Sequence, residues 1–387
     1  MRFHQTPRRG FALAVSLLAI VIIGALIAGA FFASTQESRV GRNTLVQQRA
    51  FSAAEYGLNE TVATFDKSLN LTMVAGEVQQ LTYNSSSAAG TQPSGARSNV
   101  RLTKLNDALY WVVSEGVVNA GLSNQSVRRV STTFRIRKPL FPIGGAITSK
   151  GSISVRGSAE VTGNNTAPVG WTQCPGIGGN DTAAIAVGDS ATVTIQKTDN
   201  VTGTADFYRD PKYDDTSTFK QFGSEINFAE MAANADVILT DSRPNPSPVG
   251  TDSTCDRTGG NLQTNWGEPW RGFGTNGCRN YFPVIYHNGD LQIDGGRGQG
   301  VLLVSGSVRF NGNFEFYGVI IATNDVTKGN GTAKIYGSII AGDNVRADDT
   351  SLLGNTFIFY SKCANESATR ASSIIVPVNQ RAWADMF

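Results

Sequence analysis

The sequence has no proline between Pro7 and Pro93 and no charged residue from Phe11 to Gln36. Because proline breaks helices most strongly, nothing in this stretch forces a helix to end. Only His287 represents histidine beyond the first ten residues, and the four cysteines form no CxxC pair, so no metal site or cofactor is indicated. The 33 basic and 31 acidic residues leave a net charge of +2 without a basic stripe, which gives no support for nucleic-acid binding.

The uncharged stretch is almost continuously apolar from Phe11 to Ala33. About 20 apolar residues in a helix cross a bilayer core, so this segment is long enough to span a membrane once. Three arginines precede it and the first charge after it is Glu37, so the positive-inside rule places the N-terminus in the cytoplasm. A cleavable secretory signal is the alternative, because Ala28-Gly29-Ala30 has the form of a small-residue cleavage site.

Beyond the apolar run, larger apolar residues continue at helical spacing: Phe51, Ala54, Leu58, Val62, Phe65 and Leu69. Steps of three and four residues place them on one face of a helix. The spacing predicts a single helix over residues 11–69. Its first half is expected to face lipid and partner helices, and its amphipathic second half to pack on a globular domain.

Two motifs in this region carry a family resemblance. Arg8-Arg9-Gly10, which precedes Phe11, looks like the leader end cut by prepilin peptidases. The segment ESRVGRNTLVQQRAFSAAEYGLNE (Glu37–Glu60) closely resembles the N-terminal domain of PilX-type minor pilins of type IV pili. The matching positions are Glu37, Arg39, Asn43, Arg49, Ala50, Phe51, Ala53, Ala54, Glu55, Gly57 and Leu58.

The resemblance implies that prepilin peptidase removes the leader 1–10 between Gly10 and Phe11 and that the new N-terminus is methylated. It also implies storage in the bacterial inner membrane, then entry into a pilus at the cell surface. The partners would be major and minor pilins, contacted through the N-terminal helix, and the inner-membrane assembly machinery. Most pilins carry a glutamate where this chain has Val15, and many have a proline within the span. Both departures favour a minor subunit that primes assembly at the tip, where a buried charge pair with a neighbour is not required.

The remainder of the chain, with 42 glycines and 13 prolines, is typical of turn-rich β structure. Residues 70–142 contain short β-rich runs, which predict a meander of about four antiparallel strands packed on the helix. Residues 143–387 contain repeats that align on Pro283, Gly300, Gly318, Gly337 and Gly354, at offsets of 17, 18, 19 and 17 residues. This period predicts a parallel β-solenoid rather than an antiparallel sandwich, so the predicted fold class is α+β, mainly β.

Four side chains make the solenoid prediction specific. Ile320 and Ile339 have the same phase in adjacent repeats and are expected to stack in one interior column. Lys328 falls in a variable segment and is expected to be exposed, as is Arg346. The glycine-rich run GGRGQG (Gly295–Gly300) is expected to form a turn, because it opens no helix.

Residues 171–282 break the period and are predicted to form an irregular insertion that projects from the solenoid. Insertions in repeat proteins map to one face, and that face often binds a ligand or partner. Three cysteine pairings are possible in an exported chain, and Cys255–Cys278 with Cys174–Cys363 is favoured. Clusters of aspartates raise the question of calcium, but they lack the register of a calcium-binding loop and are expected to be solvated: Asp210, Asp214 and Asp215, and Asp348 and Asp349.

Solenoids include polysaccharide-cleaving enzymes, which need paired carboxylates or a base beside a charge-stabilising group. The acidic residues of the clear repeats, Asp290, Asp294, Glu315 and Asp325, fall at different phases, so no catalytic site and no enzymatic activity are expected. The leading hypothesis is a tip-located minor pilin that exposes its solenoid for surface or ligand contact. The alternatives are a minor pseudopilin of a type II secretion system and a membrane-anchored solenoid that binds a surface polysaccharide.

Overall fold

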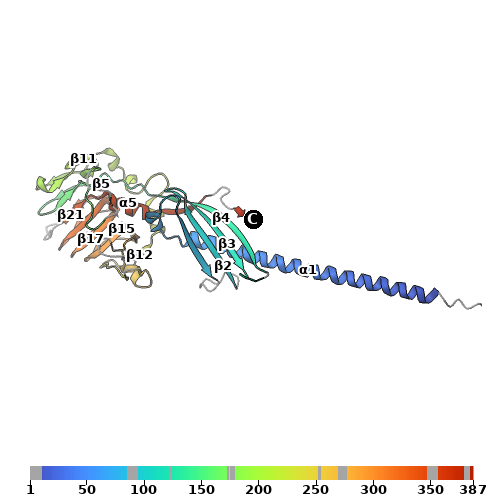
Figure 1. Ribbon diagram of the computed structural model, residues 1–387. Coiled ribbons are helices and arrows are strands. Elements are labelled where there is room, and N and C mark those ends of the chain that lie inside the picture. Colours follow the sequence, from blue (N-terminus) through green and yellow to red (C-terminus); the bar gives the residue numbers. More distant parts are fainter. Residues whose placement is uncertain are drawn as a thin grey trace, which may run out of the picture.

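The computed structural model describes residues 11–84, 95–122, 124–171, 174, 179–251, 254–268, 277–346, 356–378 and 384–386. The fold is α+β and mainly β, as the sequence predicts. A long N-terminal helix is followed by a small antiparallel sheet and then by two sheets of parallel strands. Figure 1 shows the helix extending far beyond the sheets, which form a head around its C-terminal end.

The helix α1 spans Phe11–Ala63 without a break, and the chain then forms the short helix α2 at Leu69–Thr72. The prediction of one helix to residue 69 is therefore wrong at its end. Phe65 lies in the gap between the two helices, and its ring packs edge-on against Tyr110 at 5.1 Å and Phe134 at 5.2 Å, measured between centroids. This aromatic contact with the sheet takes the place of the last predicted helical turns.

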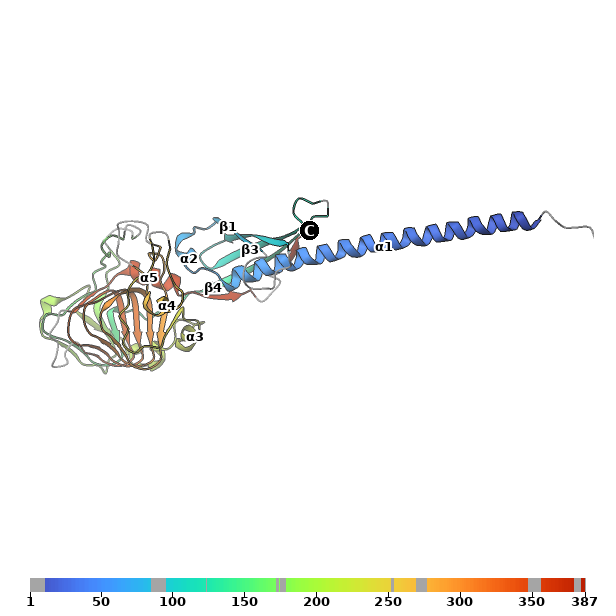
Figure 2. The ribbon, with the colours of Figure 1, turned by 90° about the horizontal axis from the view of Figure 1, so that it is seen from below.

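The small sheet has the predicted four-stranded antiparallel meander, and two strands from the C-terminal end of the chain complete it. Figure 2 shows it lying along the C-terminal part of α1. Its strands are β1 (Val78–Asn84), β2 (Ala96–Lys104), β3 (Leu109–Val118), β4 (Ser126–Arg137), β22 (Ile374–Pro377) and β23 (Ala384–Met386). Both β22 and β23 pair with β4.

The other strands form a parallel coil in which each turn pairs with the next. Three long strands, β15, β17 and β19, run in register side by side. Each bends at a glycine in the left-handed region: Gly300 (φ 107°), Gly318 (φ 135°) and Gly337 (φ 144°). Their bounds are Gly296–Val304, Phe314–Ala322 and Ala333–Ala341. The bend divides each strand into two halves, so the coil has three sides.

The first side comprises the strand halves before the bend, with β7 (Glu160–Thr162), β10 (Val201–Thr202) and β21 (Thr356–Phe359). The second side comprises the halves after the bend, with β5 (Gly145–Ser149), β8 (Ala183–Val187), β11 (Phe207–Arg209), β12 (Val237–Leu239) and β13 (Val284–His287). The third side is a separate sheet of β6 (Ile153–Val155), β9 (Val193–Ile195), β14 (Leu291–Ile293), β16 (Val308–Phe310), β18 (Val326–Lys328) and β20 (Val345–Arg346).

Apolar side chains, mostly aliphatic and stacked from one coil to the next, fill the interior. Ile320 pairs with Ile339, both are buried, and both belong to the interior core, which confirms the predicted column. The same column continues through Leu302 on one side and through Ile147 and Ile185 on the other. Each coil is thus stabilised mainly by its two neighbours.

The coils do not follow one another in sequence order. On the second side the order is β12-β13-β15-β17-β19-β5-β8-β11, so the chain enters the stack in the middle at β5. It also leaves from the middle, after β21, through helix α5 (Lys362–Ala371) to β22. The solenoid is therefore inserted between β4 and β22 of the small sheet, and residues 374–386 do not belong to it.

The predicted projecting insertion, residues 171–282, is largely part of the coil. It supplies β8 to β12, and residues 213–231 cover the outer face of the second side with Tyr213, Phe219, Phe222 and Met231. The covered face carries alternate residues of the second-side strand halves, such as Val319 and Ile321. These strand halves have mainly apolar side chains on both faces, because both faces are buried.

The glycine-rich run 295–300 is not a turn, because Gly296–Gly300 forms the start of β15. The glycines permit close approach of the segment that closes this end of the coil. A Cβ on Gly298 would lie 2.7 Å from Cβ of Trp266, and one on Gly296 would lie 2.1 Å from the carbonyl oxygen of Pro246. Trp266 is fully buried and closes the interior against Phe314.

Lys328 contradicts the expectation of an exposed side chain. It is only 3% exposed, at a register position held by Phe310 in the preceding coil. Its ammonium donates to the carbonyl oxygens of Gly329 and Gly331, at 2.6 and 2.9 Å. Burial lowers the pKa of Lys328 below the usual lysine value. The side chain of Arg346 lies outside the described residues.

Candidate assembly helix and the head it carries

The N-terminal half of α1 contacts nothing else in the chain that the structure describes. Its large apolar side chains are exposed, among them Phe11 at 81%, Leu26 at 69% and Phe31 at 70%. It is the one helix in the described residues that is long and apolar enough to cross a membrane, and none of its apolar window is buried. Such a surface requires either lipid or other apolar helices around it.

The residues of the family motif divide between the free and the seated parts of α1. Glu37, Arg39, Asn43 and Arg49 are exposed, whereas Phe51 and Glu55 are half-buried. Phe51 packs against the core between the helix and the small sheet. Gly10, the predicted cleavage position, lies outside the described residues, and Phe11 is the first residue of the helix.

Small residues seat the helix on the sheet. The buried helix residues are Ala50, Ala53, Ala54, Gly57, Leu58 and Thr61. A Cβ on Gly116 of β3 would lie 2.0 Å from the carbonyl oxygen of Ala50, and one on Gly57 would lie 2.5 Å from Cβ of Ser98. The Ser98 hydroxyl donates to the carbonyl oxygen of Ala53. Helix and sheet backbones therefore approach closely along the line 50–53–57–61.

The stripe of larger apolar residues that the sequence predicts, from Phe51 to Leu69, lies mostly at the margin of this contact. Of its members, Ala54 and Leu58 are buried, while Phe51, Val62 and Phe65 are half-buried beside them. The small-residue pattern Ala50-x-x-Ala53-Ala54-x-x-Gly57 is the signal that would have identified the seat.

Polar contacts fix the small sheet and the segment between α1 and α2 to the solenoid. The Lys67 ammonium lies 2.8 Å from the Asp236 carboxylate, and both side chains are about a quarter exposed. Arg137 pairs with Glu230 and Arg135 with Glu225 across the same junction.

A buried lysine supports the junction from the small-sheet side. The Lys104 ammonium donates to the carbonyl oxygens of Asn70 and Met73, at 3.1 and 2.9 Å, and burial lowers the pKa of Lys104. The Asn70 amide in turn donates to the carbonyl oxygen of Arg370, at 2.9 Å. The chain around α2 is thus bound both to the small sheet and to the segment that leaves the solenoid.

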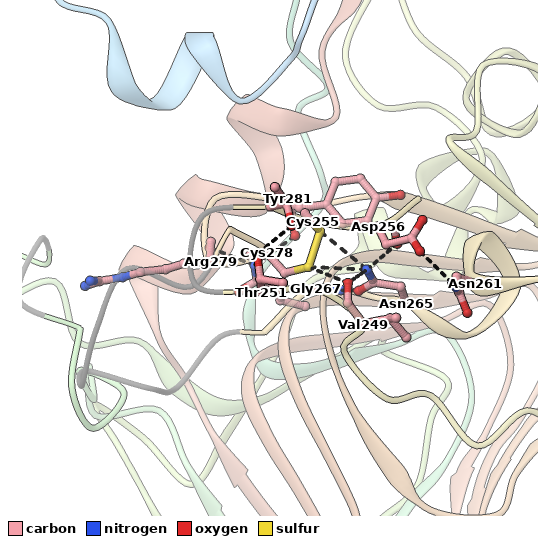
Figure 3. The surroundings of a disulfide bond; sticks show 12 residues. Val249, Thr251, Cys255, Asp256, Asn261, Asn265, Gly267, Cys278, Arg279 and Tyr281 are labelled. Atoms are coloured by element: carbon pink, nitrogen blue, oxygen red, sulfur yellow. Dashed lines mark hydrogen bonds between the residues drawn. A yellow bond between two sulfur atoms is a disulfide. The ribbon is translucent and has the colours of Figure 1, made fainter. Parts of the chain in front are cut away.

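Both disulfides lie in the head and follow the pairing favoured from the sequence. Figure 3 shows the Cys255–Cys278 bond with Asn265 beside it. The fully buried Asn265 amide donates to the carbonyl oxygens of Val249 and Asp256, at 2.9 and 2.7 Å. Gln299 of β15 donates to three carbonyl oxygens of residues 278–281, which attaches this disulfide-closed segment to the end of the coil.

The second bond, Cys174–Cys363, joins residues 189 positions apart and connects a loop between β7 and β8 to the first turn of α5. Aromatic rings stack beside it along the first side of the coil: Trp171 on Tyr317 at 5.7 Å, and Tyr317 on Tyr336 at 4.8 Å, between centroids. The bond therefore holds the exit of the solenoid chain against the coil.

No family model matches this chain. A search of curated proteins also found no match. Among solved structures, the chain is similar to the competence-associated pilin ComZ from Thermus thermophilus, with 12% sequence identity over 88% of this chain and 97% of that chain. The TM-score is 0.23, which is too low to show a shared fold, so nothing about fold or function rests on that match.

The aspartates considered for calcium hold turns of the head. Asp210 pairs with the Lys212 ammonium at 2.7 Å and also accepts from the Lys212 backbone N–H. Asp215 accepts from the backbone N–H of Ser217, and Asp214 accepts from the Ser190 hydroxyl. These hydrogen bonds lower the pKa of each carboxyl. The described residues contain no group of three or more potential metal-ligating side chains, and Asp348 and Asp349 lie outside them.

The acidic residues of the repeats are separate from one another. Asp290 accepts from the Ser307 backbone N–H at 2.7 Å, and Asp325 accepts from that of Asn344 at 3.0 Å, so both hold corners between coils. Glu315 accepts from the Tyr317 hydroxyl, and Asp294 from the Gln292 amide. His287 is buried at the end of β13 and contacts the carbonyl oxygen of Asp290 through Nε2. Asp290, Asp325 and His287 thus lie at corners of the coil, whereas Glu315 is bonded within its own strand.

Proposed function

We propose that this chain is a minor pilin of a type IV pilus, located at the tip, which primes assembly and displays its solenoid outside the cell. The observation that carries the proposal is the part of α1 between the apolar run and the sheet. Residues 34–45 are helical and exposed, and they extend the helix by about 18 Å. A plain membrane anchor does not require such a segment, because a flexible linker would connect the span to the head equally well. Packing against helices of other subunits would stabilise this segment.

The junctions described above support the same proposal. A subunit that transmits force from its helix needs a head that is attached rigidly to that helix. The close helix–sheet contact at Gly57 and Gly116 and the three ion pairs at the solenoid junction both oppose such movement. We further propose that the chain is a structural and binding protein rather than an enzyme, since each acidic residue of its coils is held by a different hydrogen-bond donor.

Mass spectrometry of sheared filaments tests the proposal. The expected result is recovery of this chain with filaments, beginning at Phe11 and carrying a methylated N-terminus. Recovery with an intact Met1 from cells with active prepilin peptidase would overturn it. Recovery with the pseudopilus of a type II secretion system instead of the pilus would reassign the chain to that machine.

A further inference from the structure

A polar groove of about 770 Å³ runs along the solenoid at the corner between its second and third sides. Its floor is a column of four successive coils. Val304, Ala322, Ala341 and Ser149 pair in register, and the groove residues that follow them directly are Ser305, Thr323, Gly342 and Lys150. Because adjacent strands lie about 4.8 Å apart, four coils give a floor about 14 Å long with one step per coil.

The opposite wall comes from the segment that covers the second side of the coil. It contributes Thr216, Lys220, Gln221, Asn227 and Phe228, the last at the start of helix α3 (Phe228–Ala233). The lining is thus mainly hydroxyl and amide groups with one aromatic ring. Lys150 is occupied, since its ammonium donates to the Thr216 hydroxyl.

Two charged side chains in the groove have ligand-binding capacity left. Lys220 and Asp343 are exposed, and their ammonium and carboxylate groups make no hydrogen bond or ion pair within the described part of the chain, although their backbones are hydrogen-bonded. Asn324, also exposed, accepts only a long hydrogen bond of 3.5 Å from Thr323. The lining therefore has two cations against one carboxylate, with uncharged donors and acceptors between them.

We propose that this groove binds an extended oligosaccharide that carries carboxylates. An extended β-1,4-linked sugar chain repeats at close to the spacing of the coils, so successive rings meet successive floor residues. Hydroxyl and amide groups match sugar hydroxyls, and Lys220 pairs with a uronate carboxylate. The lining does not suit an apolar helix, because Phe228 and Ala229 are the only residues of the lining with apolar side chains. Two lysines are also too few to neutralise a run of nucleic-acid phosphates.

This inference deepens the proposed function, and it rests on that function only for display of the groove outside the cell. Binding is measured with the full-length chain in detergent micelles by isothermal titration calorimetry, with a β-1,4-linked mannuronate tetrasaccharide as the probe. Cellotetraose, which has the same linkage and no carboxylate, is the comparison ligand. The expected result is binding of the mannuronate and at least about tenfold weaker binding of cellotetraose.

Two pairs of variants locate the site. Lys220→Ala and Asn324→Ala should each weaken mannuronate binding about tenfold. Lys197→Ala and Asn330→Ala, which change the same residue types at exposed positions outside the groove, should not. Absence of mannuronate binding, equal binding of the two sugars, unchanged binding in both groove variants, or equal binding of a single-stranded oligonucleotide would each overturn the inference. Because the assay contains no filaments, its failure leaves the minor-pilin proposal intact, and failure of filament recovery leaves the binding result intact.

Discussion

Ile320 shows what a single interior position contributes to the coil. It is fully buried between Leu302 and Ile339 in a column that has no polar partner. We predict that Ile320→Ala lowers the free energy of unfolding by about 2–5 kcal/mol, through lost burial and the cavity left behind. Ile238→Ala is the matched control, because Ile238 is 55% exposed on the outermost strand, and it should change stability by less than about 0.5 kcal/mol. Chemical denaturation followed by circular dichroism measures both, and similar losses would contradict the interior column.

Lys328 has the opposite character, because a charge occupies a position where a neighbouring coil has Phe310. Its two carbonyl partners compensate only in part for the loss of water. We predict that Lys328→Met leaves the free energy of unfolding at pH 7 unchanged or raises it by up to about 2 kcal/mol. Lys334→Met, at an exposed position of β19, the next strand along the chain, is the control and should have little effect. A loss of several kcal/mol in Lys328→Met would show that the ammonium is required by the fold.

The same residue makes stability depend on pH in a defined direction. Burial lowers the pKa of Lys328 in the folded chain below the usual value of 10.5. Between the folded and unfolded pKa values the unfolded chain binds more protons, so the unfolding free energy rises as pH rises through this window. Below the folded pKa the full penalty of burying the ammonium remains. The Lys328→Met variant should lack this part of the slope when unfolding is followed from pH 7 to pH 10.5, and an unchanged slope would exclude Lys328 as its source.

At the scale of elements, the contact between α1 and β3 depends on the absence of side chains. A Cβ on Gly116 would lie 2.0 Å from the Ala50 carbonyl oxygen and 2.5 Å from the Ala54 nitrogen, both of which are backbone atoms of the helix. Gly116→Ala should therefore push the helix from its seat and cost about 1–3 kcal/mol. Gly41→Ala, on the exposed part of α1 with nothing within 4 Å, should instead stabilise slightly, because alanine favours helix. Thermal unfolding of both variants measures these changes in stability. An unchanged melting temperature in Gly116→Ala would contradict the close contact between helix and sheet.

The disulfides act on segments rather than single coils. Cys174–Cys363 attaches α5 to the coil at the point where the chain leaves for β22. We predict no alkylation of the native, unreduced protein, since no cysteine is free. Replacing Cys174 and Cys363 together by alanine should cost about 2–4 kcal/mol through the added freedom of the unfolded chain. The variant in which Cys255 and Cys278 are both replaced by alanine is the comparison. Four alkylated thiols in the native protein would contradict the prediction.

At the scale of the whole molecule, the N-terminal part of the helix projects on one side of the small sheet, and the solenoid lies on the opposite side (Figure 1). In the sequence, the solenoid is inserted between two strands of that sheet. If the chain serves at a pilus tip, the apolar Val15 suits a position that needs no charge pair with a neighbour. Val15→Glu should then remain in the membrane but change the number or length of filaments. Val15→Leu is the control and should behave like the natural chain. Electron microscopy of cells carrying each variant measures this, and filaments identical to those of the natural chain in Val15→Glu would show that the position is irrelevant.

The sequence by itself was sufficient for features that repeat locally. The apolar run from Phe11 predicted the exposed helix, because hydropathy alone sets the length of an apolar helix. The spacing of Ile320 and Ile339 predicted the interior column, because each coil repeats the same turn and buries the same phase. Alternating β-rich runs predicted the meander. The structure that these residues adopt depends on neighbours that are close in sequence or one repeat away.

Tertiary structure decided what depends on distant segments meeting. Phe65 ends the helix early because Tyr110 and Phe134 offer it a buried aromatic site, which no local propensity encodes. The entry and exit of the solenoid lie in the middle of the stack because both must connect to β4 and its partner β22, and strand pairing places those two side by side. The groove combines Lys150 with Asn324 and Lys220, which are brought together only by that order of coils.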